Sequence, residues 1–354
     1  MTADFRPRDA MQSVDAPPMT NNDEVAHLMT EPRIWVLVDG ISGHESQSLG
    51  VAEALGLPFE TRKIAHAGLA GQANALGLAA LGGLTPEAKA GLKPPWPEIV
   101  IAAGRRLAPV ARAIKRKCAG AAKLVQIMDP GRGFGAFDLV AAPRHDGCRA
   151  RDNLIETTGA PNRVTAAKLS AGAQRWRAKC EDIPKPFIAL LLGGSTRRRP
   201  FGPALAAELG GKASVLAGGA GGSLLVLTSR RTEADAIEAL AGAIDVAAHI
   251  HRFGQGRENP YYGFLGLADA IIVTGDSMSM CSEACTTGKP VYIFAPPAIV
   301  KPAFARLHQE LFDLSMARPL GETFEAWTYP RLDAASEIAA EIRKRFGLPA
   351  ARNR

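Results

Sequence analysis

Two glycine-rich segments carry residue types that bind or transfer phosphorylated groups. The first, residues 39–47 (DGISGHESQ), follows the apolar run Ile34–Val38 and places Gly43 and His44 where a helix is expected to begin. A histidine at such a turn can exchange a proton near neutral pH. The GxxG spacing lacks the three glycines of a dinucleotide-binding loop, which disfavours that kind of site. A loop that only closes a turn explains the glycines equally well, and His44 is the feature that favours a functional site.

The second segment follows the apolar run Phe187–Leu192. It consists of Gly193, Gly194 and Ser195 and is followed by the basic residues Arg197, Arg198 and Arg199. Glycines let the backbone approach an oxyanion, and guanidinium groups pair with phosphate oxygens through two hydrogen bonds. A run of arginines is often only a solvated surface. Because this run adjoins a glycine loop, we expect the segment to bind a diphosphate.

A third segment, residues 274–283 (TGDSMSMCSE), places hydroxyl groups and one carboxylate around the start of an expected helix. Ser277 or Ser279 can cap that helix without any ligand. An acid such as Glu283 also suits the positive end of the helix dipole. A carboxylate at this position can instead accept hydrogen bonds from two vicinal ribose hydroxyls, and the sequence leaves both interpretations open.

Residues 99–128 form a locally basic region with seven basic and no acidic side chains: Arg105, Arg106, Arg112, Lys115, Arg116, Lys117 and Lys123. The whole chain of 354 residues has 42 Lys and Arg against 35 Asp and Glu, a net charge of +7. Aromatic residues make up only 6% of the chain and none lies among these cations, which disfavours nucleic acid as a partner. An anionic lipid surface or a phosphorylated acceptor fits better, and a solvated basic helix remains an alternative.

Other classes of site lack support. The sequence has no GxSxG, Walker A or HExxH motif, and His249 and His251 have no third residue spaced to complete a metal site. We expect neither a metal nor a cofactor. The five cysteines form no CxxC pair, which indicates reduced thiols and a cytoplasmic protein.

Two segments could be mistaken for membrane elements. Residues 1–30 lack the apolar core of an export signal and are expected to be a disordered lead-in. Residues 67–86 carry no charge but include five glycines, which make a poor membrane-spanning helix. We expect an ordinary core helix and loop there, with contact to a bilayer surface as the alternative.

Short apolar runs alternate with helix-length segments along the chain, a pattern typical of parallel sheets covered by helices. The polar stretch 180–186 (CEDIPKP) interrupts this pattern. We therefore predict an α/β protein with two Rossmann-like domains, residues 31–182 and 183–354. The expected strands are residues 34–38, 99–103, 124–128, 139–142, 187–192, 224–228, 246–250, 270–274 and 291–294. The expected helices are residues 45–55, 107–117, 203–216, 233–243, 279–287, 302–316 and 334–346.

Ten segments together resemble the bacterial relatives of the plant mitochondrial-fission ELM factor. They keep their order from residue 35 to residue 296: Trp35–Gly40, Gly43 with His44, Gln47 with Ser48, Ala103–Arg106 with Pro109, Gln126–Pro130, Pro143–Asp146, Leu192–Ser195, Leu227–Thr232, Asn259–Tyr261 and Thr274–Glu283. That family is regarded as GT-B-type glycosyltransferases, similar in architecture to the lipid-linked N-acetylglucosaminyl transferase of peptidoglycan synthesis.

The resemblance implies a GT-B-like fold, in which two Rossmann-like domains face each other across a cleft. The first domain would hold an acceptor and the second a nucleotide-sugar donor. His44 matches the histidine proposed as general base in the lipid-linked transferase. The loop Gly193–Ser195 matches its diphosphate loop, and Glu283 matches its ribose-binding glutamate.

Chemistry leads to the same assignment of roles. An inverting transfer needs a base for the acceptor hydroxyl, which His44 can supply, and positive groups for the leaving diphosphate, which Ser195 and Arg197 can supply. On the acceptor side the further candidates are Gly43, Arg105, Asp129 and Asp146. The expected partners are a nucleotide sugar and a lipid-linked or membrane-bound acceptor at the cytoplasmic face of the inner membrane, without nucleic acid.

Two other functions remain open from the sequence. Asp129 and Asp146 each follow an expected strand, where they could serve as the additional acids of a nucleotide-sugar epimerase. A non-catalytic scaffold that binds a membrane or a protein is the other alternative, since it would keep the core without needing His44 and Glu283.

Overall fold

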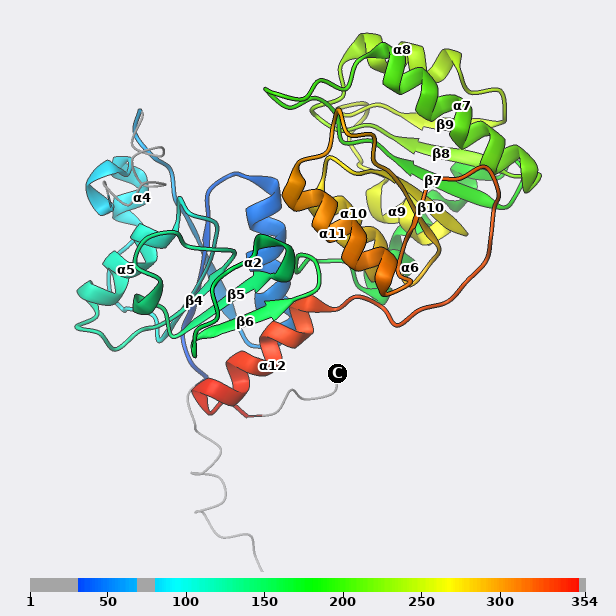
Figure 1. Ribbon diagram of the computed structural model, residues 1–354. Helices are drawn as coiled ribbons and strands as arrows, with labels where there is room; N and C mark the ends of the chain where they lie inside the picture. Colours follow the sequence, from blue (N-terminus) through cyan, green and yellow to red (C-terminus); the bar gives the residue numbers. More distant parts are fainter. Residues whose placement is uncertain (1–30, 69–79, 350–354) are drawn as a thin grey trace, which may run out of the picture. The chain divides into compact units, whose positions relative to one another are not determined.

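The computed structural model describes residues 31–68 and 80–349, which form two parallel β-sheets of six strands each (Figure 1). The expected disordered lead-in at residues 1–30 lies outside the described residues. So does most of the uncharged stretch 67–86, because residues 69–79 are not described.

The first sheet has the strand order β2-β1-β3-β4-β5-β6. Every residue of its central strands β1 and β3 is buried, because helices cover both faces and apolar side chains are needed on each. The strands are β1 (Ile34–Val38), β2 (Phe59–Lys63), β3 (Ile99–Ala103), β4 (Lys123–Ile127), β5 (Leu139–Pro143) and β6 (Leu154–Thr157). The helical segments of this half are α2 (Ser42–Leu55), η1 (Leu81–Gly83), α4 (Pro86–Ala90), α5 (Ala108–Lys117), η2 (Phe134–Ala136) and η3 (Arg144–Asp146).

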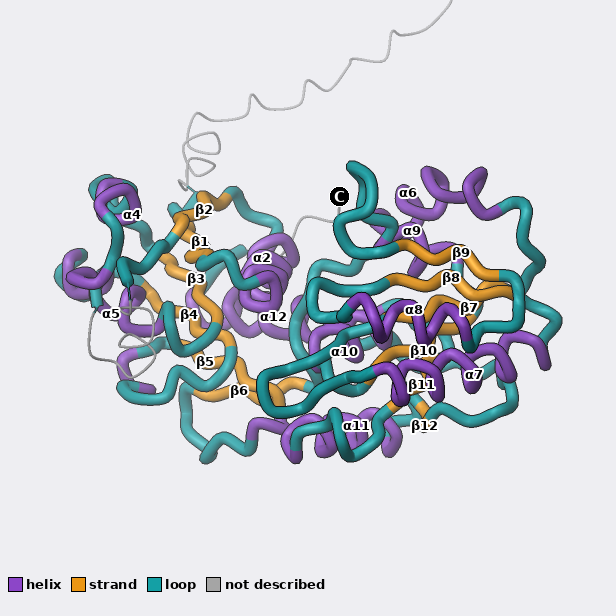
Figure 2. The backbone as a smooth tube through the Cα atoms, turned by 90° about the horizontal axis from the view of Figure 1, so that it is seen from above, coloured by secondary structure: helices purple, strands orange, loops and turns teal. Residues whose placement is uncertain are grey.

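The second sheet has the order β12-β11-β10-β7-β8-β9. Its strands are β7 (Phe187–Leu191), β8 (Ser223–Leu227), β9 (Ala248–His251), β10 (Ala270–Thr274), β11 (Val291–Phe294) and β12 (Arg318–Pro319). The remaining helical segments are α6 (Ala166–Trp176), η4 (Arg177–Cys180), α7 (Pro203–Gly219), α8 (Ala234–Gly242), α9 (Tyr261–Leu267), α10 (Met278–Thr286), α11 (Pro302–Asp313) and α12 (Ala334–Phe346). Helices α7 and α8 pack on one face of this sheet and lie in front of its strands in Figure 2, whereas α6, α9, α10 and α11 pack on the other face.

Each sheet has a point where the chain reverses the direction in which strands are added. In the first sheet this point lies between β1 and β3, and in the second between β7 and β10. Open parallel sheets bind ligands beyond the carboxyl ends of the two strands at such a point, because the following connections diverge to opposite faces. The topology therefore directs attention to the loops after β1, β3, β7 and β10.

The sequence predicts a domain boundary between residues 182 and 183. Two helices pack against the sheet on the other side of that boundary. Helix α6 precedes that division, yet Leu169 and Trp176 belong to the apolar cluster on the second sheet. Helix α12 follows it, yet Ile338 and Ile342 belong to the cluster on the first sheet. Each helix has one apolar side, and the sheet that the side meets decides where the helix packs.

The nine strands expected from the sequence are all present, with ends shifted by at most two residues. The seven expected helices are also present, with ends shifted by at most three residues. The strands β2, β6 and β12 and the helices α4, α6 and α9 were not expected.

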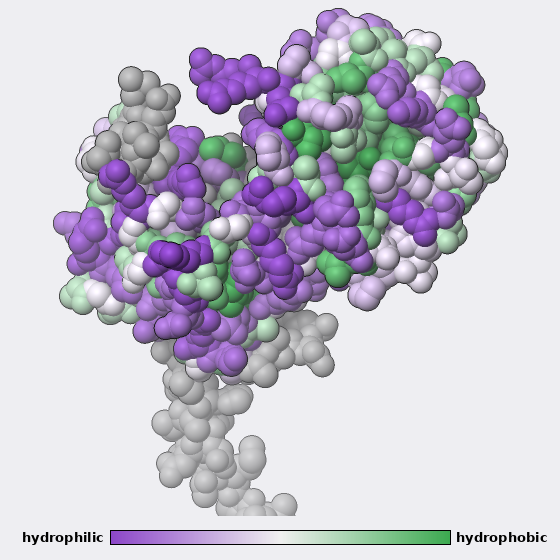
Figure 3. Space-filling model, viewed as in Figure 1, coloured by the Kyte–Doolittle hydropathy of each residue, from purple (hydrophilic) through white to green (hydrophobic). Residues whose placement is uncertain are grey.

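Hydrophilic residues cover most of the visible face around α4 and α5 (Figure 3). Helix α5 buries Val110 and Ile114 against the sheet and exposes Arg116 and Lys117. The basic segment thus presents part of its charge to solvent. Among the described residues, no helix is long and apolar enough to cross a bilayer.

Candidate functional site

The first turn of α2 holds His44 beside a carboxylate from the loop after β1. Asp39 follows β1 directly, and its Oδ2 lies 3.3 Å from His44 Nδ1. Its Oδ1 accepts a hydrogen bond from the amide of Ile41 at 3.2 Å. Burial alone would raise the pKa of Asp39, but the hydrogen bond and charge of His44, with help from Ile41 and Arg106, lower it below its ordinary value. Asp39 stays ionised and fixes the imidazole through Nδ1, an arrangement that leaves Nε2 for a proton acceptor or donor role.

The imidazole of His44 lies directly over Gly104, the residue after β3. A Cβ at Gly104 would stand 2.6 Å from Cε1 of His44, and Gly104 has φ +80°, so only glycine fits here. Because β1 and β3 flank the reversal point of the first sheet, His44 occupies the position where the topology predicts a ligand.

A cavity of about 360 Å³ opens beside His44. It is lined by His44, Gly104, Arg105, Arg106, Met128, Asp129 and Asp146. The structure therefore brings together three of the four acceptor-side candidates with the candidate base, and the fourth, Gly43, precedes His44 in the chain.

The two aspartates of this cavity differ in environment. Asp129 pairs with Arg105, and its Oδ1 accepts the amide of Gly131 at 2.9 Å. Burial and the nearby charge of Asp129 raise the pKa of Asp146 above its ordinary value. One carboxylate is thus held as an ion pair, whereas the other is biased toward its protonated form.

The loop after β7 is tightly bound to its surroundings. The amide of Gly193 donates to Thr274 Oγ1 at 2.7 Å and that of Gly194 to Asp276 Oδ2 at 3.1 Å. The amide of Ser195 donates to the carbonyl of Arg231 at 2.9 Å. All three amides have partners within the protein, so in this conformation they are not available to a diphosphate as the sequence suggested.

The side chains after this loop divide into two kinds. Ser195 Oγ accepts the amide of Phe201 at 3.0 Å and so shapes the entry to α7. Arg199 donates to the carbonyl of Pro297 at 2.8 Å, which gives it a structural role. Arg197 and Arg198 are exposed to solvent. Arg197 therefore remains accessible to an anion.

The start of α10 carries the other donor-side candidates. Ser277 caps the helix by accepting the amide of Met280 at 3.4 Å. Glu283 accepts hydrogen bonds from the hydroxyl groups of Ser46, at 3.2 Å, and Tyr261. Burial raises the pKa of Glu283, and these two hydrogen bonds oppose the rise. The carboxylate thus already binds two hydroxyl groups, the kind of partner that a ribose would offer.

Two contacts join the reversal points of the two sheets. Ser46, on α2, donates to Glu283, on α10. A Cβ on Gly43 would stand 3.5 Å from Ser279 Oγ, so the start of α2, next to His44, packs against the first turn of α10. The candidate base and the candidate donor-binding helix are therefore neighbours, although about 235 residues separate them in the chain.

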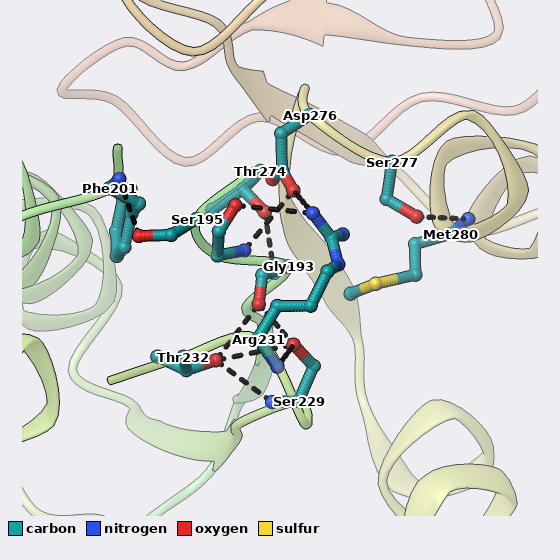
Figure 4. Close-up of polar contacts among 11 residues, drawn as sticks. Gly193, Ser195, Phe201, Ser229, Arg231, Thr232, Thr274, Asp276, Ser277 and Met280 are labelled. Atoms are coloured by element: carbon teal, nitrogen blue, oxygen red, sulfur yellow. Dashed lines mark hydrogen bonds and ion pairs between the residues drawn. The ribbon is translucent and has the colours of Figure 1, made fainter. Parts of the chain in front are cut away.

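Sequence reasoning missed three polar residues at these points. Asp39 was not recognised as the partner of His44, although it lies five residues before it. Arg231 and Asp276 were not recognised as an ion pair beside Gly193, shown in Figure 4. Arg231 and Asp276 follow β8 and β10, which lie on either side of β7 in the sheet, so the strand order was the missing information for this pair.

A second cavity, of about 290 Å³, lies among α2, the residues around Asn162 and the start of α12. None of the candidate residues borders it. Within the described part of the chain, no three His, Cys, Asp or Glu side chains are placed to hold a metal ion.

The strand order and the paired reversal points define an α/β protein of the GT-B type, with two Rossmann-like sheets. The chain belongs to the mitochondrial fission ELM1 family, whose family model matches residues 42–346. It is 30% identical over 274 residues to the mitochondrial fission protein ELM1 of Arabidopsis thaliana, a match that covers 70% of this chain and 64% of that protein. An uncharacterised protein of Rickettsia prowazekii is 28% identical over 352 residues, covering 88% of this chain and 97% of that one.

Solved structures with a similar fold are more distant. MurG of Acinetobacter baumannii is 13% identical with a TM-score of 0.45, covering 89% of this chain and 92% of its own. The UDP-GlcNAc 2-epimerase of Methanocaldococcus jannaschii, in complex with UDP-GlcNAc and UDP, is 12% identical with a TM-score of 0.49, covering 88% and 99%.

Proposed function

We propose that the protein is a glycosyltransferase that moves a sugar from a nucleoside-diphosphate sugar to a hydroxyl group of an acceptor. The observation that carries the proposal is the packing of the first turns of α2, which carry His44, against the first two turns of α10, through Gly43 and Ser279 and through Ser46 and Glu283. This packing brings a base held by a carboxylate next to a helix start that suits a phosphate.

The donor would bind at the reversal point of the second sheet. The start of α10 offers backbone amides without partners inside the helix and the positive end of its dipole. Glu283 would exchange its hydrogen bonds from Ser46 and Tyr261 for bonds from the ribose hydroxyls. Arg197 and the hydroxyl groups of Ser277 and Ser279 would contact the diphosphate, so the transfer needs no metal ion.

The acceptor would enter the cavity beside His44. Asp39 holds Nδ1 of the imidazole, so Nε2 is the atom that takes the proton from the acceptor hydroxyl as the new bond to the sugar forms. Arg105, paired with Asp129, lines the same cavity and supplies a positive charge for a phosphorylated acceptor.

A calorimetric titration with nucleoside diphosphates and nucleotide sugars tests the donor site, and turnover of the nucleotide sugar tests the base. Loss of a general base costs about 10²- to 10⁴-fold in rate. We therefore expect His44→Ala to lower turnover by that factor and to leave nucleotide affinity nearly unchanged. Wild-type turnover in the variant would contradict the role of His44, and a wild-type protein that binds no nucleotide would contradict the donor site.

The acceptor is proposed to be lipid-linked, at the cytoplasmic face of a membrane. Exposed Arg116 and Lys117 at the end of α5 lie in the same half as the acceptor cavity. Each basic residue near an anionic surface contributes about 1 kcal/mol, and salt screens the effect. Flotation with anionic vesicles should be lost at high salt and in an Arg116→Glu, Lys117→Glu variant. Equal flotation with neutral vesicles would contradict the role of these basic residues, and no flotation with either kind of vesicle would favour a soluble acceptor.

A nucleotide-sugar epimerase is the second candidate, because Asp129 and Asp146 line the same cavity as His44. The raised pKa of Asp146 suits an acid that donates a proton near neutral pH. Incubation of a nucleotide sugar in deuterated water distinguishes the two reactions. An epimerase that breaks a carbon–hydrogen bond incorporates deuterium without an acceptor, whereas a transferase incorporates none.

A further inference from the structure

The ion pair of Arg231 and Asp276 has no role in the sequence-based assignment, yet it lies at the centre of the donor-side loop. Asp276 follows β10 and its side chain is 1% exposed. Its Oδ2 lies 2.7 Å from Arg231 Nη1 in an ion pair and accepts a hydrogen bond from the amide of Gly194. Its Oδ1 is buried and has no hydrogen-bond partner among the described residues.

The surrounding backbone is shaped to admit this pair. A Cβ at Gly193 would stand 2.2 Å from Asp276 Oδ2, and a Cβ at Gly194 would stand 2.2 Å from the carbonyl oxygen of Arg231. Neither position can hold a larger residue without moving the pair. The two glycines therefore make room for a carboxylate and an arginine, which explains the glycine loop more directly than contact of its amides with a ligand.

Arg231 is anchored on one side and open on the other. Its Nη1 also donates to the carbonyl of Gly194 at 3.2 Å, and its own amide donates to Ser229 Oγ at 3.1 Å. Its side chain is 32% exposed, and the part of the chain that the structure describes offers no acceptor to its Nε or Nη2. Figure 4 shows this side chain extending from the loop after β8 across Gly193 to Asp276, with Ser277 nearby at the start of α10.

We propose that Arg231 binds the diphosphate of the nucleotide sugar and that Asp276 is the positioning residue that orients its guanidinium group. The inference rests on the proposed function and identifies the cation that this site uses. An anchored, planar guanidinium loses little conformational freedom when it binds, and its free edge can donate two hydrogen bonds to phosphate oxygens. Arg197 by comparison is exposed to solvent.

The first test compares two adjacent arginines by calorimetric titration with UDP, ADP, GDP, CDP and inorganic pyrophosphate. A hydrogen bond to a charged group contributes enough that its loss should weaken binding about ten- to a hundredfold in Arg231→Ala. Arg231→Lys should recover only part of this affinity, because lysine lacks the planar fork. Arg230→Ala is the matched control, because Arg230 is exposed and its substitution removes the same charge. This variant should bind the nucleotides with wild-type affinity.

The second test separates positioning from general damage. Asp276→Asn should weaken binding in the wild-type background and have no further effect when Arg231 is already alanine. If Asp276→Asn melts below the assay temperature, Asp276→Glu replaces it, because it keeps the charge and displaces the carboxylate.

The possible failures are distinguishable. Wild-type affinity in Arg231→Ala, while the wild type itself binds a nucleoside diphosphate, overturns this inference and leaves the proposed function intact. Equal losses from Asp276→Asn with and without Arg231 overturn the positioning role. A wild type that binds neither nucleotide nor pyrophosphate overturns the proposed function together with the inference.

Discussion

Two buried histidines should make the protein sensitive to mild acid. His145, on η3, and His308, on α11, are each 3% exposed. Burial lowers the pKa of both to about 4, with the charges of Arg306 and His308 adding to the effect at His145. A hydrogen bond with the backbone of Gly275 opposes the fall at His308 without cancelling it.

The direction of the effect follows from proton uptake in the two states. An unfolded histidine binds a proton near pH 6.5, whereas these two do so in the folded protein only near pH 4. Above pH 6.5 neither state is protonated and stability does not depend on these groups. As the pH falls below 6.5, the unfolded state gains protons first, so the free energy of unfolding decreases until about pH 4.

The magnitude follows from the size of the shift. Each histidine contributes about 1.4 kcal/mol per pH unit within this window, or about 2 kcal/mol between pH 6.5 and pH 5. Urea unfolding at pH 7, 6 and 5 measures the loss. The variants His145→Gln and His308→Gln should each remove about half of the histidine-dependent decrease, whatever their stability at pH 7. A pH dependence identical to that of the wild type in both variants would refute the reasoning.

Three further predictions concern the site and its support. Glu283→Ala should weaken nucleotide binding with little change in melting temperature, and a collapse of the melting temperature with unchanged affinity would instead indicate a structural role. Asp39→Asn should lower turnover at least tenfold with unchanged nucleotide affinity, because a neutral amide cannot stabilise the charge that His44 gains with the acceptor proton, and unchanged turnover would show that Asp39 does not support the base. Gly50→Ala should lower the free energy of unfolding by about 1–3 kcal/mol, since its Cβ would stand 2.3 Å from the carbonyl oxygen of Asn162, and wild-type urea stability would contradict the packing of α2.

The sequence was most informative where a strand is buried on both faces. Strands such as β3 and β10 consist almost entirely of apolar residues, so the length of the apolar run is enough to predict a strand buried on both faces. The edge strand β2 has the sequence FETRK, and three of its five residues are exposed, so no apolar run marks it. Helix α9 contains two glycines, whose low helix propensity is offset by close packing against α6.

The candidate site was predictable in its parts and not in its contacts. His44, Gly193 and Glu283 stand out in the sequence because a histidine, a glycine or a glutamate that follows the end of a strand can take part in ligand binding or proton transfer. The partners Arg231 and Asp276 do not, because an ionic contact between distant loops depends on strand order, which a single sequence does not reveal. Asp39 lies close to His44 in the sequence, but aspartates are common in turns, so its residue type alone does not mark it as the partner of His44. For the same reason, the sequence could not show that the amides of the Gly193 loop are already hydrogen-bonded within the protein.

The return of α12 to the first sheet has a consequence for how the chain folds. Ile338, Ala339 and Ile342 complete an apolar cluster whose other buried members lie between residues 34 and 141. During translation, the whole second sheet is therefore synthesised before α12 is available to complete the core of the first sheet. A fragment ending near residue 182 would keep α2 but leave the part of this face that α12 covers exposed, and such a fragment should aggregate when expressed alone. The two sheets share no strand, but the first sheet cannot complete its core until the chain of the second sheet has been synthesised.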